Sequence, residues 1–161
     1  MVEVDGELIR DVMARHASSV CVVTTLYDGR LHGLTVSSFC SVSLDPPLVL
    51  VCVARLANSC EFIRSSGLYA VNLLSWRQMF LADRFSGRAP LVGANFDEVQ
   101  YRPAVTGAPI LEGCLAWVDC RVQDTHEGGD HVIFVGHVEA AGLGPQDAAL
   151  VHVNRRFQRI G

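Results

Sequence analysis

Apolar positions near the start of the chain follow a helical period. In residues 5–16 the apolar side chains recur three and four residues apart and share one helix face: Leu8, Ile9, Val12 and Met13. Asp5 is placed to cap the first turn of this helix. The pattern then changes, because residues 19–26 are rich in β-branched side chains and run into Asp28-Gly29. This predicts a hairpin whose second strand begins near Leu31.

The next region mixes hydroxyl-rich and apolar runs. Residues 35–43 are dense in Ser and Thr, and Pro46-Pro47 separates them from an apolar strand at 48–54. If residues 35–43 are extended, one face carries four hydroxyl side chains and an aromatic ring: Thr35, Ser37, Phe39, Ser41 and Ser43. A short helix through Arg64 is expected to follow, with Asn58 or Ser59 as its cap and Gly67 at its end.

The second half of the chain predicts more strands than helices. Residues 68–74 are a predicted strand, and the capping-box pattern at 75–78 opens a helix toward Arg84. Residues 86–109 form a long, irregular excursion expected to cover a partner. Strands at 115–122 and 132–140 are joined by a connection at 123–131, and a last strand runs over 149–153. The prediction is a single domain over residues 1–161, mainly β, a barrel with a few flanking helices.

Composition narrows the possible functions. The 161 residues carry a net charge of −4, and the 13 basic residues are scattered, all of them Arg. Nucleic-acid binding is not expected, and chemistry that needs a lysine amine is excluded. The six cysteines lack CxxC spacing and are expected to be buried thiols in a reducing compartment. The histidines lack metal-ligand spacing, so no metal is predicted. No apolar run spans a bilayer, and a cytoplasmic protein without membrane contact is expected.

Three segments are candidates for chemistry, each with a simpler alternative. The hydroxyl row that starts at Thr35 can hydrogen-bond a flat heterocycle, or can line a solvated strand face. Arg55, with Asn58 and Ser59 at a helix start, outlines an anion site, or is an ordinary helix start beside a surface arginine. His131 follows a Gly-Gly-Asp turn, where it either serves a site or is solvated. No GxSxG or GxGxxG motif is present, so neither a hydrolase elbow nor a Rossmann dinucleotide site is predicted.

Taken in order, these segments resemble the flavin reductase family with the FMN-binding split-barrel fold, the reductase components of two-component flavin-dependent monooxygenases. The resemblance rests on GLTVSSF at 33–39, SVSLDPPLV at 41–49, YAVNLL at 69–74, and GDH at 129–131 followed by VGHV at 135–138. It implies a homodimer in which FMN or FAD is reduced by NADH or NADPH and passed to a partner monooxygenase.

The resemblance also implies roles for individual residues. The isoalloxazine ring would contact Thr35, Val36, Ser37 and Ser38. The ribityl phosphate would lie near Ala54, Arg55, Asn58, Ser59 and Cys60. His131 would lie near the nicotinamide as the catalytic candidate, with Asp130 and Phe157 as further cofactor-binding residues. Two positions depart from the family pattern, namely Cys60 in place of a hydroxyl residue and VNRRF at 153–157 in place of an aromatic-glycine pattern.

The chemistry implied by the resemblance is hydride transfer from nicotinamide C4 to flavin N5, which needs no covalent nucleophile from the protein. The protein would supply stacking geometry and hydrogen bonds. Two alternatives remain open at this point. One is a non-enzymatic flavin carrier or redox sensor, and the other is an enzyme like pyridoxamine-phosphate oxidase. The residues choose neither between FMN and FAD nor between NADH and NADPH.

Overall fold

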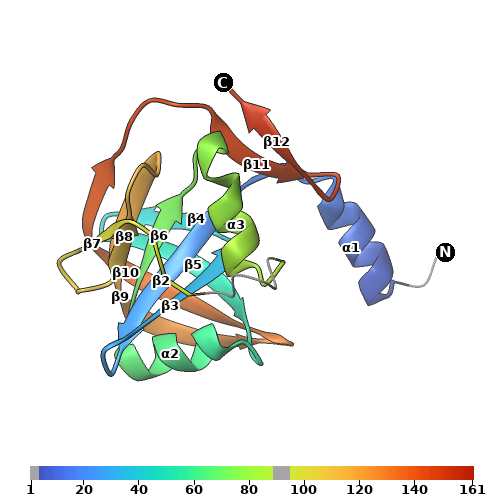
Figure 1. Cartoon of the computed structure of the whole chain (residues 1–161). Helices are drawn as coiled ribbons and strands as arrows, with labels where there is room; N and C mark the ends of the chain where they lie inside the picture. Colours follow the sequence, from blue (N-terminus) through green and yellow to red (C-terminus); the bar gives the residue numbers. More distant parts are fainter. Residues whose placement is uncertain (1–3, 89–94) are drawn as a thin grey trace.

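The computed structural model describes residues 4–88 and 95–161 and is built mostly of antiparallel strands (Figure 1). The helices are α1 (Gly6–Ala14), α2 (Asn58–Ser66), the 3-10 turn η1 (Trp76–Gln78) and α3 (Met79–Phe85). The first strands are β1 (Ser18–Ser19), β2 (Cys21–Tyr27), β3 (Arg30–Val36), β4 (Cys40–Leu44), β5 (Pro47–Ala54) and β6 (Leu68–Leu73). The remaining strands are β7 (Tyr101–Pro103), β8 (Pro109–Leu111), β9 (Ala116–Gly128), β10 (His131–Leu143), β11 (Ala149–Val153) and β12 (Arg156–Ile160). The predicted mainly-β class with a few helices is confirmed.

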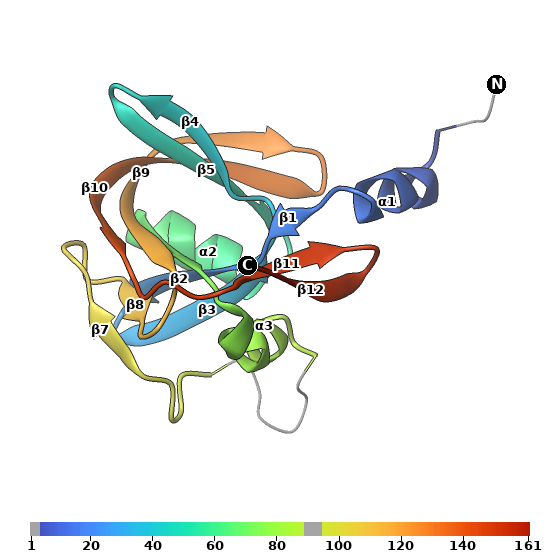
Figure 2. The same cartoon turned by 90° about the horizontal axis from the view of Figure 1, so that it is seen from above.

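One seven-stranded sheet dominates, in the order β3-β2-β6-β9-β10-β5-β4. Its two edge strands, β3 and β4, follow each other in the sequence, so the chain crosses from one edge to the other between them. The sheet therefore curls round until its edges meet, as the view from above shows (Figure 2). Ser38, just after β3, bonds to β5, the strand beside the β4 edge, because its hydroxyl donates to the Cys52 carbonyl (2.9 Å) and accepts from the Cys52 N–H (3.0 Å). We call this junction of β3 and β5 the seam.

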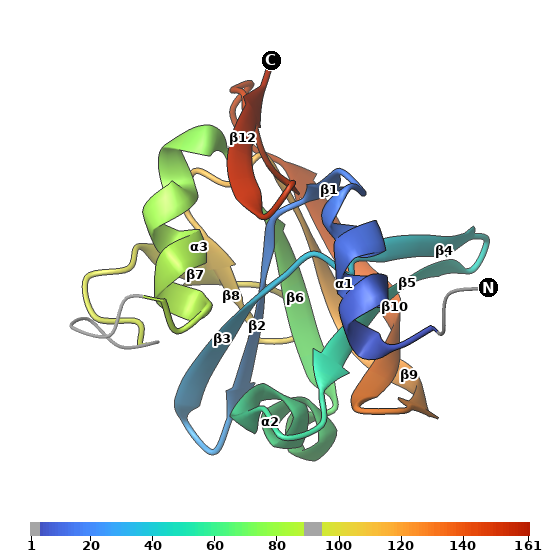
Figure 3. The same ribbon diagram turned by 90° about the vertical axis from the view of Figure 1, so that its right-hand side faces the viewer.

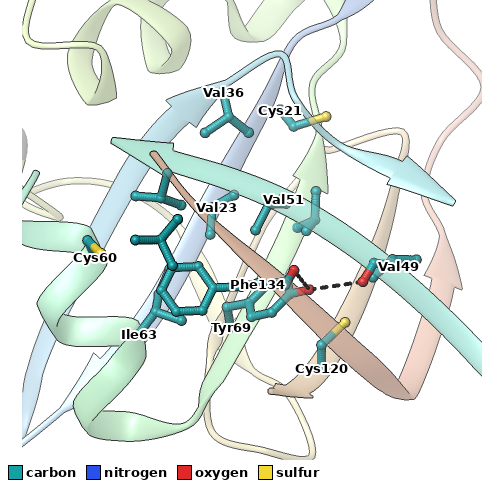
Figure 4. Packing of buried hydrophobic residues seen from close by; sticks show 13 residues of the cluster. Cys21, Val23, Val36, Val49, Val51, Cys60, Ile63, Tyr69, Cys120 and Phe134 are labelled. Atoms are coloured by element: carbon teal, nitrogen blue, oxygen red, sulfur yellow. Dashed lines mark hydrogen bonds between the residues drawn. The ribbon is translucent and has the colours of Figure 1, made fainter. Parts of the chain in front are cut away.

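The interior of the curled sheet holds the main core (Figure 4). Val51, Val53 and Phe134 are fully buried there beside Tyr69, whose hydroxyl lies 3.4 Å from two backbone carbonyl oxygens. Gly136 is required at this point, since a Cβ on it would lie 2.5 Å from the Tyr69 hydroxyl oxygen. Burial of such side chains, each worth about 1.5–3 kcal/mol, fixes the positions of β5 and β10 and with them the seam.

Helix α3 covers the outer side of β3 (Figure 3). The ring of Phe85 packs so closely on Gly33 that a Cβ there would meet it at 2.6 Å. Thr35 donates its hydroxyl hydrogen to the Ala82 carbonyl at 2.7 Å, which ties the end of β3 to this helix. Packing and hydrogen bonding thus fix the strand end that leads into the seam.

Several local predictions are confirmed. Asp5 caps α1 by accepting from the Leu8 N–H at 2.8 Å, and the hairpin of β2 and β3 turns at Asp28-Gly29. The capping box at η1 is present, with both the Ser75 and the Gln78 side chains bonded to backbone N–H groups.

Other predictions are wrong. The extended run at 35–43 breaks after Val36, because the chain must turn to cross the seam. Ala57, not Asn58 or Ser59, is the N-cap of α2, and no side chain caps that helix. The connection predicted at 123–131 is hairpin-like as expected, but most of it belongs to the two long strands β9 and β10, with the turn at 129–130, and β12 was not predicted. These strand ends project beyond the core, so they lack the apolar alternation that marks a half-buried strand.

Three findings bear on the expected compartment and on the long excursion. The excursion at 86–109 falls partly on residues 89–94, which lie outside the described residues, while its later part includes β7 and the start of β8. All six cysteines are free, but Cys40 is exposed and Cys52 half-buried, so the expectation of burial fails for these two. In the described residues, no helix combines the length and apolar character needed to cross a membrane.

Candidate functional site

A pocket of about 300 Å³ opens at the seam. It is lined by Leu34, Thr35, Val36, Ser37, Ser38, Cys52, Ala54 and His131. Six of these lining residues were singled out from the sequence, and they come from three segments far apart along the chain. Leu34 and Cys52 were missed, since an apolar strand residue and an unpaired cysteine give no signal of a site. We call this the seam pocket.

Strand pairing explains why His131 reaches the seam pocket. His131 is the first residue of β10 and lies opposite Ala54 in the register with β5. The preceding turn contains Gly129 at φ +68°, a left-handed conformation that glycine adopts at little cost. The tight turn therefore delivers the imidazole next to the end of β5.

Asp130 orients the imidazole of His131. The His131 Nδ1 lies 2.7 Å from the Asp130 carboxylate, and this hydrogen bond, together with the charge of the imidazole when protonated, lowers the pKa of Asp130. An ionised carboxylate only accepts hydrogen bonds, so Nδ1 carries a proton. The neutral ring then keeps Nε2 as its acceptor. His131 is thus a half-exposed, oriented imidazole at the pocket mouth.

The hydroxyl row is used differently from what the sequence indicated. The hydroxyls of Thr35 and Ser38 are engaged with backbone groups of Ala82 and Cys52. Ser37 is exposed, and its hydroxyl has no hydrogen-bond partner among the described residues. As β3 is an edge strand, alternate backbone N–H groups face away from β2. The groups available to a ligand here are therefore Ser37 and backbone amides.

The expected anion site around Arg55 is largely closed. The Arg55 guanidinium donates to the Gly129 carbonyl (2.7 Å) and pairs with the Glu127 carboxylate (2.8 Å). Glu127 also binds Arg64 at 2.5 Å, and that hydrogen bond is the main cause of its lowered pKa. Arg55 thus fastens the β9–β10 turn to the end of β5, which supports His131 indirectly.

The start of α2 offers little to a phosphate. Cys60 is 3% exposed and belongs to the main core, where α2 carries it (Figure 4). Its N–H donates to the Ala57 carbonyl at 2.9 Å. Ser59 is also buried, and only Asn58 is exposed. The expectation that Ser59 and Cys60 hold a phosphate conflicts with this burial, since core packing takes up both side chains.

Phe157 lies in a different pocket from His131. This smaller pocket, about 150 Å³, is lined by Val20, Thr35, Val36, Ser37, Ser86, Arg88, His152 and Phe157. It shares residues 35–37 with the seam pocket, so the two adjoin along the end of β3. Arg88 and His152 were not predicted, because neither belongs to a recognisable motif. Among the described residues, no cluster of three His, Cys, Asp or Glu side chains is placed to hold a metal ion.

Comparison with known proteins places this geometry in context. Residues 13–161 match the model of the flavin reductase like domain. The chain belongs to the flavin reductase family.

Curated and solved members of the flavin reductase family are similar over most of the chain. The reductase subunit HsaB of a flavin-dependent monooxygenase from Mycobacterium tuberculosis is 36% identical over 138 residues, covering 86% of this chain and 72% of that protein. The solved flavin reductase PheA2 superposes with a TM-score of 0.89 at 33% identity, covering 98% of this chain and 99% of that one. The NADH:FAD oxidoreductase SgcE6 of Streptomyces globisporus, solved with NAD and FAD fragments, gives 0.89 at 32% identity and covers 100% and 98%.

Proposed function

We propose that this protein binds the ring of FMN or FAD at the seam pocket, reduces it with NADH or NADPH, and passes the reduced flavin to a flavin-dependent monooxygenase. The supporting observation is the convergence of residues 35–38, Ala54 and His131 on one pocket in a member of the flavin reductase family. Several relatives are named reductases or reductase subunits, which favours a reductase over a flavin carrier or an enzyme like pyridoxamine-phosphate oxidase.

The seam pocket fits a flat, neutral heterocycle. Its described lining contains no carboxylate and no guanidinium, so no fixed charge has to be desolvated when a ring enters. The Ser37 hydroxyl and the edge amides of β3 supply hydrogen bonds to ring carbonyls and nitrogens. When bound, the flavin supplies the hydride acceptor. Amides that face the ring also stabilise the negative charge that reduction brings.

His131 acts in this proposal as a positioning residue. Asp130 fixes the imidazole so that its Nε2 accepts a hydrogen bond, which suits the carboxamide N–H₂ of a nicotinamide. An imidazole held this way would orient the donor ring toward the flavin, and hydride transfer depends on that orientation. No proton transfer by His131 is required.

We further propose a homodimer that acts as a single-domain, cytoplasmic protein. Helix α1 projects from the barrel (Figure 1), and none of its residues is buried within the described chain. Ile9, Val12 and Met13 are each at least half exposed on one face. A second copy of the chain is the partner we assign to this face. The free thiols fit a reducing compartment.

A steady-state assay tests the reaction. Oxidation of NADH and of NADPH is followed against FMN, FAD and riboflavin, which also selects the preferred pair. Flavin-dependent oxidation supports the proposal, whereas a tightly held flavin that NAD(P)H does not reduce would favour the carrier. Light scattering tests the dimer, and a monomer at micromolar concentration would contradict it.

A further inference from the structure

A third pocket adjoins the seam pocket and the Phe157 pocket at Ser37, which lines all three. It has a volume of about 510 Å³ and lies between α1, the end of β3 and the β11–β12 turn. Its lining residues are Arg10, Met13, Ala14, Ser37, Arg88, His152 and Arg155. We call it the arginine pocket.

The charge of this pocket is strongly positive. Three guanidinium groups line it, and no carboxylate does among the residues that the structure describes. Arg155 pairs with Asp11, whereas Arg10 and Arg88 have no ion pair in the described chain. The charge of Arg10 is the smallest of the causes that lower the pKa of Asp130, after the hydrogen bond and charge of His131. In a protein of net charge −4, such a concentration of cations marks a site for an anion.

Arg155 lines this pocket with its backbone in an unfavourable, left-handed conformation. Asn154 and Arg155 form the β11–β12 turn with φ of +51° and +61°. Asn tolerates the left-handed region, but Arg has no such preference. The turn lies against the end of α1 (Figure 3), where the Asn154 N–H donates to the Ala14 carbonyl. A residue that is unfavourable for the turn is thus held where its guanidinium faces the pocket.

His152 does not change the net charge of the arginine pocket. Burial, and secondly the charge of Arg88, lower the pKa of His152, so it stays neutral near pH 7 and adds a hydrogen-bonding group. The pocket therefore combines guanidinium forks with an uncharged imidazole and the free Ser37 hydroxyl. This set of groups suits a phosphate better than a carboxylate, since a phosphate offers more acceptor oxygens.

We propose that the arginine pocket binds a phosphate or diphosphate group of one of the two nucleotides that react at the seam pocket. The inference rests on the proposed function, because Ser37 connects the two pockets and a nucleotide whose ring lies in one extends into the other. The group belongs either to the flavin or to the nicotinamide donor, and the two sources differ in their kinetic signature.

Three variants test the proposal. Arg88→Gln and Arg155→Gly each remove one charge, and the glycine also relieves the left-handed conformation, so that variant keeps its fold. Arg159→Gln is the control, since Arg159 is exposed on β12 and lines neither pocket. The Michaelis constants for NADH, NADPH, FMN and riboflavin are measured for each, and pyrophosphate is tested as an inhibitor of the wild type.

Each test variant is expected to raise one Michaelis constant about tenfold, the effect of losing a charge-assisted hydrogen bond. A rise for FMN but not for riboflavin assigns the group to the flavin. A rise for NADH or NADPH with riboflavin as acceptor assigns it to the donor. Pyrophosphate is expected to compete with the same substrate.

Two results separate failure of this inference from failure of the proposed function. Constants within about twofold of the wild type for both variants, together with no inhibition by pyrophosphate, would overturn the arginine pocket while the reductase activity stands. A wild type that oxidises neither NADH nor NADPH with any flavin would instead remove the proposed function. Pyrophosphate binding, measured by titration calorimetry, would then decide the pocket on its own.

Discussion

The two pockets that meet at Ser37 differ in how they are built. The seam pocket is lined by residues of three strands in one sheet and by the strand end after β3, and its described lining carries no fixed charge. The arginine pocket takes its residues from α1, from the segment after α3, from the β11–β12 hairpin of a separate sheet and from Ser37, and it is cationic. Strand pairing positions small groups closely, whereas long guanidinium side chains reach across gaps between elements.

This difference fits the two parts of a nucleotide substrate. A ring needs exact placement for hydride transfer, and the sheet supplies it through register and hydrogen bonds. A phosphate needs positively charged groups close to it, and long arginine side chains from helix, loop and turn segments supply them. Substitution of His131 tests the seam pocket alone, and substitution of Gly33 displaces the strand that leads into Ser37. A pair of serine variants and a thiol-labelling experiment then separate the contributions of the two pockets.

The largest expected effect follows from His131→Ala. Loss of the oriented imidazole should lower the rate of flavin reduction about 100-fold, the cost of slight misplacement of a reacting group, and leave flavin binding nearly unchanged. Stopped-flow bleaching of oxidised flavin under anaerobic conditions gives the rate, and fluorescence quenching gives the binding. His126→Ala is the control, because His126 is exposed on the same hairpin and lines neither pocket. If His131→Ala bleaches flavin at the wild-type rate and binds NADH normally, no nicotinamide lies at this hairpin.

The next effect is expected from Gly33→Ala. The new methyl group would overlap the Phe85 ring, at 2.6 Å, and force β3 and α3 apart. Overpacking of this kind costs about 1–3 kcal/mol, so the denaturation midpoint should fall. Since β3 leads directly into Ser37, which lines both pockets, the Michaelis constants for flavin and donor should rise together. Gly6→Ala is the control, because nothing lies within 4 Å of a Cβ at Gly6. Unchanged stability would show that Phe85 moves aside freely.

The sequence predicted these pockets unevenly, and the reason is physical. Thr35, Ser37 and His131 were found because short-range patterns mark strand ends and tight turns, and strand ends gather at the rim of a barrel. Val36, Ser38 and Ala54 were named as site residues only through the resemblance to the flavin reductase family. Arg88 and Arg155 were missed because a lone arginine carries no period or spacing, and its neighbours depend on how separate elements pack. The backbone bonds of Ser38 and the burial of Cys60 were not foreseen, since a sequence shows a hydroxyl or a thiol but not the backbone group or core that engages it.

A matched serine pair tests which hydroxyl faces the ligand. Ser38→Ala would leave the Cys52 N–H without its partner and weaken the seam, at a cost of about 1–2 kcal/mol in the free energy of unfolding. Ser37→Ala should leave stability unchanged, because its hydroxyl has no partner in the described chain, and should raise a substrate Michaelis constant severalfold. Thermal denaturation and steady-state kinetics separate the two effects. Equal loss of stability in both variants would contradict the distinction drawn between them.

The smallest expected effect is on the rate of thiol labelling, which reports ligand binding in the seam pocket without a measurement of catalysis. Cys52 lines that pocket, and burial, followed by the charge of Cys40, raises its pKa, so its labelling should still speed up with pH where an ordinary thiol is already ionised. Flavin at about twice its Kd should slow labelling of Cys52 about threefold by simple occupancy. Cys40, exposed on β4 and outside the pocket, should react at the same rate with or without flavin.

Two further features of the thiol experiment make it decisive. Cys21 and Cys120 serve as internal references, because burial raises each pKa to about 12 and they should react only after denaturation. Pyrophosphate should leave the labelling of Cys52 unchanged, since a phosphate in the arginine pocket does not cover the seam. Mass spectrometry of the labelled peptides measures all four thiols in one sample. If flavin protects Cys40 and Cys52 equally, the protection is a global change in the protein, and the seam pocket is not where the ring binds.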